Sequence, residues 1–365
     1  MKAAVLRAYH TPLTIEDVTL GSLGPREVRV RTVACGVCHS DLHCLEGGLP
    51  VPPPTVLGHE PAGVVEEVGA EVRHVQPGDH VIGCLSAFCG SCEYCLRGEP
   101  NLCGGEATAR GPEAPPRLHR GDETLHQFAH LSAFAEEMLV HENALVKIRR
   151  EMPLEQAALI GCGVTTGLGA ALNTAQLRPG ETAVVIGCGG VGLSAIQGCR
   201  IAGASRVIAV DTVAWKLDLA QKLGATDGID ATQGDALAQV LERSGGGVDY
   251  AFECIGTVAT CQQAPMMIRK GGTCVLVGVV PLGTGVEFQP LDLVLQGKKI
   301  VGSMMGGNRF RIDMPRFVDF YLDGRLMLDE MISARLGLEE INTAFDKMKA
   351  GEIARSVICF EGARQ

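Results

Sequence analysis

The stretch Ala183-Val184-Val185-Ile186-Gly187-Cys188-Gly189-Gly190-Val191-Gly192 decides the fold of the second half of this chain. Four apolar residues that suit a buried strand run directly into a G-x-G-x-x-G pattern. The first glycine allows the turn, the second lets the backbone approach a pyrophosphate, and the third lets helix and strand pack closely. A helix that follows would point its free N–H groups at the phosphates. The pattern predicts a dinucleotide site formed by Gly187, Gly189, Gly190, Val191 and Gly192.

The next apolar stretch, Arg206–Val210, ends at Asp211. An acidic residue at this position binds the adenosine ribose hydroxyls and repels a 2′-phosphate, so the sequence favours NAD over NADP. Two alternatives stay open: Asp211 could only cap a helix, and Lys216 could reach the same ribose or be a solvated helix lysine.

Strand-like and helix-like stretches alternate from Thr182 onward, which predicts an α/β fold with a doubly wound parallel sheet of the Rossmann type. The predicted strands of this sheet are Thr182–Gly187, Arg206–Asp211, Val248–Cys254, Thr273–Gly278 and Lys299–Met304.

The first 150 residues have a different texture, irregular and rich in Pro, Gly, Cys and His. Glu27–Val33 alternates with a period of two, as a half-buried strand does, and the proline-containing segment Gly111–Gly121 reads as an exposed loop. A last strand is predicted over Ser356–Phe360.

Charge and composition exclude several classes of protein. The net charge of −10 leaves no basic surplus to neutralise nucleic-acid phosphates. No signal peptide begins the sequence and no apolar run reaches membrane-spanning length, so we expect a soluble, cytoplasmic protein without a membrane partner. In such a chain, 15 cysteines indicate metal binding or catalysis rather than disulfides.

Four of these cysteines lie close together as C-x2-C-x2-C-x7-C: Cys89, Cys92, Cys95 and Cys103. Four neighbouring thiolates can enclose a tetrahedral ion, and a closed all-thiolate shell is typical of structural zinc. Two disulfides and an iron–sulfur cluster are the alternatives.

A second, dispersed set consists of Cys38, His59 and Cys162. Two thiolates and an imidazole would leave a fourth zinc position open for water or substrate, as catalytic sites do. Spacing alone does not select these three from the other cysteines and from 10 histidines.

Several motifs in register resemble one known family. C-G-V-C-H-S-D-L-H from Cys35, G-H-E from Gly58, the four-cysteine lobe, G-C-G-V-T-T-G from Gly161 and G-C-G-G-V-G from Gly187 occur in the order found in zinc-containing medium-chain alcohol dehydrogenases. The resemblance runs from about Lys2 to Phe360.

This resemblance implies a GroES-like, β-rich catalytic domain over 1–163, with a structural zinc lobe at about 84–104. It implies a Rossmann NAD-binding domain over 164–302 and a segment over 303–365 that returns to complete the catalytic domain. Each subunit would bind NAD and two zinc ions, one catalytic and one structural, and the substrate would be an alcohol or aldehyde.

The resemblance also implies residue roles. Cys38, His59 and Cys162 would bind the catalytic zinc, with Asp41 holding the His59 ring and Glu60 tuning the metal. For proton transfer, Ser40 would take the alcohol proton and His43 would deliver it to solvent. For the cofactor, His39 and Arg355 would contact the pyrophosphate and Thr166 would hold the nicotinamide carboxamide. Leu85 would line the substrate pocket. Loop, surface and helix-cap roles are the alternatives for His39, Arg355 and Thr166.

Leu85 departs from the family, where an aromatic residue often covers the substrate, and Ser40 stands where some relatives have a bulkier threonine. Together they predict room for bulky primary alcohols, such as aromatic, allylic or long-chain ones.

Three other functions remain in view. One is a dehydrogenase acting on S-hydroxymethyl thiol adducts. The glutathione-dependent relatives bind the carboxylate of the adduct with an arginine shortly after the fourth structural cysteine. At the nearest equivalent position this chain has Ala107, and Arg110 follows three residues later. A polyol dehydrogenase would have a carboxylate in place of Cys162. A non-catalytic NAD-binding structural protein tends to lose the zinc ligands, which this chain keeps. The 299–304 edge strand predicts a homodimer, with a tetramer as the alternative.

Overall fold

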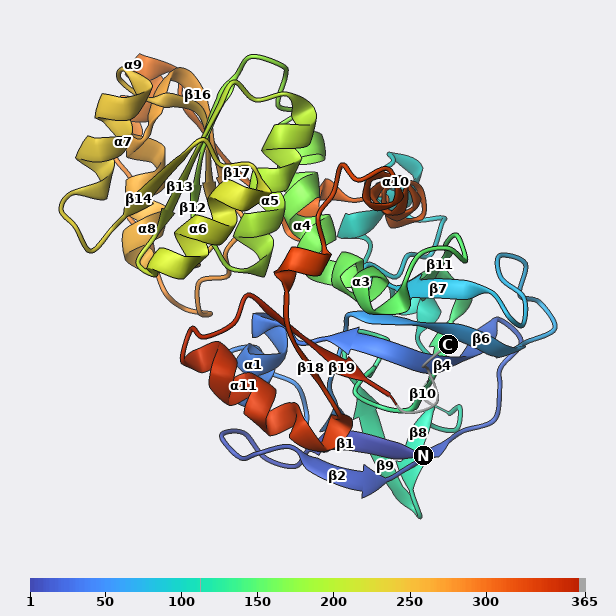
Figure 1. The fold of residues 1–365 in the computed structure, drawn as a ribbon. Helices are drawn as coiled ribbons and strands as arrows, with labels where there is room; N and C mark the ends of the chain where they lie inside the picture. Colours follow the sequence, from blue (N-terminus) through green and yellow to red (C-terminus); the bar gives the residue numbers. More distant parts are fainter. Residues whose placement is uncertain (112, 361–365) are drawn as a thin grey trace. The chain divides into compact units, whose positions relative to one another are not determined.

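The computed structural model describes residues 1–111 and 113–360, and the chain forms two compact units (Figure 1). Unit 1 contains Met1–Cys162, Arg309–Gly324 and the chain from Met331 onward, whereas unit 2 contains Gly163–Asn308 and Arg325–Glu330. The chain therefore leaves unit 1 after Cys162, builds most of unit 2, returns at Arg309, and enters unit 2 once more over Arg325–Glu330.

Unit 2 is built on one parallel sheet, in the order β14-β13-β12-β15-β16-β17 among the described residues. With β12 counted as the first strand, this is the 3-2-1-4-5-6 order of the Rossmann fold, and the strand order reverses between β12 and β15. The strands are β12 (Thr182–Ile186), β13 (Arg206–Asp211), β14 (Asp227–Asp230), β15 (Val248–Glu253), β16 (Ile268–Leu276) and β17 (Lys299–Gly302).

Helices cover both faces of this sheet, with α5 and α6 on one side and α7 and α8 on the other (Figure 1). They begin and end at recognisable caps: the Asp235 side chain accepts hydrogen bonds from two N–H groups at the start of α7, and Gly203, at φ 89°, ends α5. The helices of unit 2 are α4 (Thr165–Gly169), α5 (Gly190–Ala202), α6 (Ala214–Leu223), α7 (Ala236–Ser244), α8 (Val258–Gln263) and α9 (Pro290–Gln296), with short turns η6 (Ala264–Met266) and η7 (Met304–Gly307).

Because both faces are covered, the central strands are apolar along their length. Val184, Ile186, Ile208 and Val210 are buried in one core cluster. This is why 183–186 reads as an unbroken apolar run rather than as an alternating one.

Unit 1 is mostly β-structure. Its larger sheet has the order β11-β7-β6-β4-β19-β18, with β10 also paired to β4, and a second sheet has the order β2-β1-β5-β9-β8-β3. The long strand β4 alternates at its start and is buried throughout its second half. The strands are β1 (Lys2–Leu6), β2 (Thr14–Asp17), β3 (Thr19–Leu20), β4 (Glu27–Gly36), β5 (Thr55–Val56), β6 (Pro61–Val68), β7 (His80–Gly83), β8 (Leu118–Arg120), β9 (Glu123–Gln127), β10 (Glu137–His141), β11 (Leu145–Lys147), β18 (Ile332–Leu336) and β19 (Arg355–Cys359).

Short helices close the core of unit 1, in which Leu57, Phe134 and Phe345 are buried together. They are α1 (His39–Leu45), α2 (Glu93–Leu96), α3 (Leu154–Leu159), α10 (Phe310–Leu322) and α11 (Ile341–Lys349), with turns η1 (Pro100–Leu102), η2 (Glu106–Thr108), η3 (Glu142–Ala144) and η9 (Leu338–Glu340), while η8 (Asp329–Met331) lies where the chain passes between the units. The returning segment thus supplies α10, β18, α11 and β19, and β19 pairs directly with β4.

A continuous helical segment, Leu154–Thr174, includes α3, α4 and two π-helical stretches, η4 (Ile160–Val164) and η5 (Ala170–Thr174). Among the described residues it is the one helix long and apolar enough to cross a membrane by length and composition. Its most apolar window is 83% buried inside the protein, as expected of a core helix, so it is weak support for a membrane span.

The strand predictions need four corrections. β16 begins at Ile268, before the predicted Thr273, and β17 ends at Gly302 because Met305, Gly306 and Gly307 turn the chain with positive φ. Strand β14 was not predicted, since Asp227–Asp230 is short and polar. The predicted loop Gly111–Gly121 contains strand β8, and its Pro112 lies outside the described residues.

The unit boundaries also differ from the predicted ones. The second boundary lies at 308/309 rather than 302/303, because the Gly306 carbonyl accepts a hydrogen bond from Asn173 Nδ2 at 3.2 Å. Residues 325–330 return to unit 2, where the Gln197 side chain bonds both Met327 backbone groups.

Candidate metal and cofactor sites

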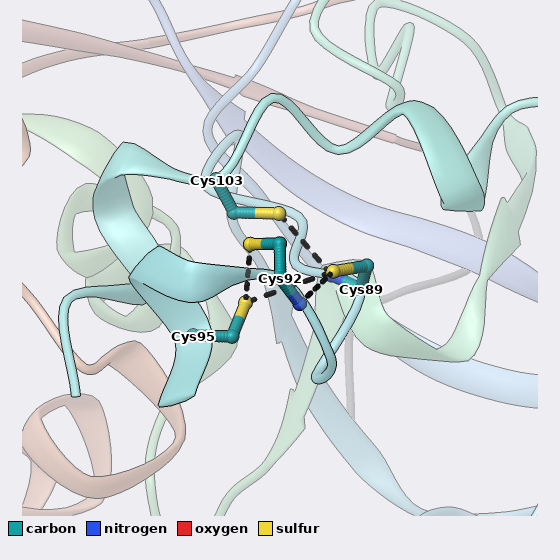
Figure 2. A group of neighbouring side chains, drawn as sticks. All are labelled: Cys89, Cys92, Cys95 and Cys103. Carbon is teal, nitrogen blue, oxygen red and sulfur yellow. Dashed lines mark hydrogen bonds between the residues drawn. The ribbon is translucent and has the colours of Figure 1, made fainter. Parts of the chain in front are cut away.

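The four clustered cysteines turn their sulfurs toward one another (Figure 2). The Cys92–Cys95 and Cys89–Cys95 sulfur separations are 3.5 and 3.9 Å. Zinc–sulfur bonds of 2.3 Å at tetrahedral angles require sulfurs about 3.8 Å apart, so the four side chains fit a zinc ion. All 15 cysteines are free, which rules out the two-disulfide alternative in this structure.

Backbone N–H groups support these sulfurs. The Cys89 thiol accepts hydrogen bonds from Ser91 N and Cys92 N at 3.4 and 3.2 Å, and the Cys103 thiol accepts from Cys89 N at 3.3 Å. The bonds from Ser91 and Cys92 lower the pKa of Cys89 to about 6. The lobe is thus prepared to hold a thiolate, which is the form that binds metal.

The dispersed set also comes together, although its members are far apart in sequence. Ligand atoms of Cys38, His59, Glu60 and Cys162 all lie within 4.8 Å of one another, and all four residues are buried. Cys38 is the residue before α1, His59 precedes β6, and Cys162 lies in the π-helical stretch η4, a distortion often found at functional sites.

One buried atom tests whether this set fits a metal. His59 Nε2 has no hydrogen-bond partner in the described structure, although the side chain is completely buried. A buried ring nitrogen without a partner is costly unless a metal uses its lone pair. A hydrogen bond from the Cys162 thiol holds the pKa of the Cys38 thiol well below its usual range, and the electrostatic attraction of His59 acts in the same direction. Two cysteines and one histidine therefore fit zinc with an open position.

Asp41 orients the imidazole. Its Oδ1 lies 3.0 Å from His59 Nδ1 and also accepts a hydrogen bond from Gly58 N at 3.0 Å. The carboxylate is fully buried. This contact fixes the ring so that Nε2 is directed to the sulfurs, the arrangement that ligating histidines usually need.

Glu60 lies in the same cluster and forms a buried ion pair with Arg355. Burial raises the pKa of Glu60 to about 7, although the Arg355 guanidinium opposes this shift. Arg355, predicted at the cofactor pyrophosphate, is therefore found beside the metal ligands, and its role toward a phosphate stays a prediction.

Three of the remaining predicted residues of unit 1 follow Cys38 on α1, and the fourth, Leu85, lies four residues before Cys89. Ser40 and His43 are half-buried on successive turns of α1, and the Cys38 thiol donates to the Ser40 hydroxyl oxygen at 3.8 Å. His39 is exposed at the first position of α1, and Leu85 is half-buried just after β7.

The glycine motif adopts the geometry that its pattern predicts. Gly187 has a φ of 92°, and a Cβ on Gly192 would lie 1.7 Å from the Gly187 carbonyl oxygen. A Cβ on Gly189 would meet nothing within 4 Å. Protein atoms thus occupy the space beside Gly187 and Gly192, whereas the middle glycine, Gly189, leaves space for a ligand at the start of α5.

Asp211 ends β13 beside this loop. Its Oδ2 accepts from Cys188 N at 2.7 Å, and its Oδ1 accepts from Thr212 N and Val213 N at 2.8 and 3.0 Å. The carboxylate thus ties the loop to the start of α6, and the side chain remains partly exposed. Lys216 is half-buried, with Nζ 5.7 Å from the ring centre of Trp215, the one tryptophan in the chain.

Two buried contacts in unit 2 were not predicted from the sequence. The Thr166 hydroxyl, predicted at the carboxamide, donates to the Met305 thioether at 3.4 Å, and Met305 has a positive φ of 50° that no pattern indicates. Glu253 is completely buried at the end of β15, where its Oε1 accepts from Ile255 N and Gly256 N at 2.9 Å each. An acidic residue that ends an apolar strand was the available signal for Glu253.

Comparisons with known proteins agree with this geometry. Residues 24–150 match the family described as "Alcohol dehydrogenase GroES-like domain", and residues 190–322 match "Zinc-binding dehydrogenase". The chain is 42% identical over 364 residues to "Probable S-(hydroxymethyl)glutathione dehydrogenase 1" of Schizosaccharomyces pombe, covering 98% of this chain and 96% of the relative.

The chain belongs to the zinc-containing medium-chain alcohol dehydrogenase family. Two solved structures have the same fold over 98% of this chain. One is an alcohol dehydrogenase zinc-binding domain protein from Burkholderia ambifaria, with a TM-score of 0.94, 38% identity and 98% of that chain covered. The other is benzyl alcohol dehydrogenase from Acinetobacter calcoaceticus, with a TM-score of 0.93, 33% identity and 99% covered. As a member of this family, the protein is an NAD-dependent zinc alcohol dehydrogenase whose substrates are small-molecule alcohols or aldehydes.

Proposed function

We propose that this enzyme interconverts bulky primary alcohols (aromatic, allylic or long-chain) and their aldehydes, with NAD as the hydride acceptor. The observation that carries the proposal is the buried Cys38–His59–Cys162 set, with an unpartnered imidazole nitrogen and the Ser40 hydroxyl 3.8 Å from the Cys38 sulfur.

Each residue of the set has a task in this reaction. The bound groups supply two kinds of chemistry, Lewis-acid polarisation of the substrate oxygen by zinc and hydride acceptance by nicotinamide. Cys38, His59 and Cys162 hold the metal, and Asp41 keeps the imidazole in one orientation and tautomer. Burial of all these groups keeps water away from the reacting atoms and strengthens their electrostatic effect.

The proton follows a route along α1. The Ser40 hydroxyl is the first acceptor of the alcohol proton, and His43, three residues later and partly exposed, delivers it to solvent. Side chains three residues apart in a helix lie on the same face, so the two groups serve one path. A histidine suits this exit because its imidazole ring can both accept and donate a proton.

The preference for NAD rests on Asp211. Hydrogen bonds from three backbone N–H groups hold its carboxylate in place, and a fixed negative charge there repels a 2′-phosphate. The Gly187–Gly192 loop and the start of α5 receive the pyrophosphate, with Gly189 as the open position.

The preference for bulky alcohols rests on two side chains: Ser40, whose hydroxyl lies 3.8 Å from the Cys38 sulfur, and the half-buried Leu85, which stands where relatives often have an aromatic residue. A substrate site that lacks this aromatic cover would have room for a ring or a long chain. The likeness to a benzyl alcohol dehydrogenase supports the same substrate class.

Oxidation of an S-hydroxymethyl thiol adduct is the second candidate, because a relative with 42% identity carries that name. The contacts of Arg110 speak against it. Arg110 bonds the Glu27 carboxylate and the carbonyl oxygens of Ser22 and Pro115, the latter at 2.6 and 2.7 Å. A guanidinium occupied in this way is not available to an adduct carboxylate.

Initial rates of NADH formation test the proposal. NAD and NADP are offered separately against ethanol, benzyl alcohol, cinnamyl alcohol, octanol and the S-hydroxymethyl adduct of glutathione. We expect turnover with NAD and a kcat/KM for the bulky alcohols at least tenfold above that for ethanol. A clear preference for ethanol would overturn the substrate class, and turnover with the adduct alone would establish the second candidate.

We further propose a homodimer formed through unit 2, in the cytoplasm. β17 is the edge strand of the parallel sheet, so its outer row of backbone groups can pair with a second copy. Nearby along the chain, α9 exposes Leu291, Val294 and Leu295 by 66, 78 and 73%, an apolar face that a partner subunit would cover. Size-exclusion chromatography with light scattering tests this state, and a monomer at micromolar concentration would contradict it.

A further inference from the structure

Arg311, on α10 of the returning segment, is an arginine that forms no ion pair in the described structure. Its NH2 donates to the Glu142 carbonyl oxygen at 2.7 Å, and its Nε donates to the Leu145 carbonyl oxygen at 3.2 Å. Burial lowers the pKa of Arg311 to about 10, which still leaves it charged at neutral pH. The attraction of the nearby Glu142 offsets only part of the cost of burying this cation, so its position calls for a reason.

The guanidinium lies over an aromatic ring next to the metal lobe. The Arg311 Cζ is 5.0 Å from the centre of the Phe88 ring, and Phe88 immediately precedes Cys89, the first sulfur of the lobe. The Phe310 ring meets Phe88 edge-on at 5.7 Å, so two consecutive residues of α10 hold this aromatic side chain.

The backbone of Phe88 is held as well. Asn143 Nδ2 donates to the Phe88 carbonyl oxygen at 2.7 Å, and Asn143 Oδ1 accepts from Arg311 NH2 at 3.2 Å. Asn143 is itself buried. Arg311, Asn143 and Phe88 therefore form a closed set of contacts, here called the Phe88 clamp, that fixes the residue from which the lobe begins.

We propose that the Phe88 clamp retains the zinc ion of the Cys89–Cys103 lobe, with Arg311 as its positioning residue. Four thiolates outweigh the charge of one zinc ion by two, so a cation stacked beside the first ligand also offsets the charge of the site. Residues that support metal ligands without touching the metal typically change metal affinity 10–100-fold. The proposal rests on the lobe binding zinc, as its sulfur geometry supports.

The test measures zinc release from the purified full-length enzyme with a chromophoric chelator. The lobe phase of release is identified as the phase that is missing in Cys103→Ala protein. Arg311→Met removes the charge and the hydrogen bonds at similar length, and Arg311→Lys keeps the charge but loses the planar fork. Arg316→Met is the matched control, since Arg316 lies on the same helix and is 63% exposed.

We expect Arg311→Met to release the lobe zinc at least tenfold faster than the unchanged enzyme, Arg311→Lys to be intermediate, and Arg316→Met to stay within twofold. The catalytic-site phase should not change in any of them. Cobalt substituted into the lobe gives a second readout, because its sulfur-to-metal absorption should shift in Arg311→Met even where far-UV circular dichroism does not.

Two outcomes would overturn the clamp: folded Arg311→Met that releases lobe zinc at the unchanged rate, or Arg316→Met that accelerates release equally. A different result, one zinc ion per chain in the unchanged enzyme and no phase missing in Cys103→Ala, would show that the lobe binds no zinc. That result would refute the structural zinc site itself and is distinct from a failure of the clamp. If Arg311→Met does not fold, Arg311→Lys and Asn143→Ala decide the question by the same release rates.

Discussion

The two metal-binding groups of unit 1 are built in opposite ways. The Cys89–Cys103 lobe draws its four ligands from one short stretch, half-exposed, and supports them with backbone N–H groups. The Cys38–His59–Cys162 set draws its ligands from three separate, buried parts of the chain and supports His59 with the side chain of Asp41.

This difference has a physical consequence. Local turns hold few apolar contacts, so the lobe depends on the metal for its folding. The dispersed set is placed by β4, β6 and the Leu154–Thr174 helix, which are fixed by the core of unit 1 or by their own helical bonds. Metal removal should therefore unfold the lobe. Around the catalytic set it should abolish activity but leave the fold intact.

The largest expected effect is on catalysis, from Cys162→Ala. The variant should lose one zinc ion per chain and at least about a thousandfold in kcat, because the Lewis acid that polarises the alcohol is lost. Its far-UV circular dichroism and melting temperature should stay close to those of the unchanged enzyme. Cys199→Ala, a substitution at a buried cysteine of α5, is the control and should keep both zinc ions. Full zinc content in Cys162→Ala would break the assignment.

Cys103→Ala tests the other side of the comparison. Here we expect the loss of one zinc ion together with a drop of several kcal/mol in the free energy of unfolding, since structural zinc contributes directly to folding. Limited proteolysis should cut within 84–104 in the variant and not in the unchanged enzyme. If the variant resists protease and melts normally, the lobe folds without metal and the proposed contrast is wrong.

Asp41→Asn tests whether the two zinc ions depend on separate supporting residues. An amide retains the size and a hydrogen-bond acceptor, but not the charge that favours the ligating tautomer of His59, so catalytic zinc should dissociate about 10–100-fold more readily. The lobe zinc should be unaffected. Asp17→Asn, at an exposed surface pair with Lys2, controls for the loss of one carboxylate. Equal release of both ions would contradict separate support.

The same contrast explains what could be predicted from the sequence. The lobe and the Gly187–Gly192 loop are local, so spacing alone gave their residues, and the structure places them as the patterns require. Cys38, His59 and Cys162 could be selected only through the family resemblance, because residues brought together by a fold leave no spacing rule.

Contacts between distant side chains escaped prediction for the same reason. The Glu60–Arg355 pair joins β19 of the returning segment to the start of β6, and the Phe88 clamp joins α10 to the lobe. Neither has a periodic or local signal. β14 was missed because a four-residue polar strand carries too little hydrophobic pattern to be read.

The smallest expected effect concerns Glu27, which holds the segment that follows the lobe. Burial alone would raise the pKa of Glu27, but hydrogen bonds from Arg110 and Arg117 outweigh it and lower the pKa to about 2. Because this pKa lies below the unfolded value near 4.5, the stabilisation is complete above about pH 4.5 and is lost as pH falls toward 2. At neutral pH it amounts to about 3 kcal/mol.

Urea unfolding between pH 3 and 7 measures this effect. The unchanged enzyme should lose stability below about pH 4.5 more steeply than Glu27→Gln, which should be weaker at pH 7 and less dependent on acid. Glu67→Gln, at a surface pair with Arg29 that is 55% exposed on the glutamate side, should follow the unchanged enzyme. If the curves of Glu27→Gln and the unchanged enzyme stay parallel in acid, the segment after the lobe is not held by ionised Glu27. Its attachment would then rest, like the lobe itself, on metal and local turns.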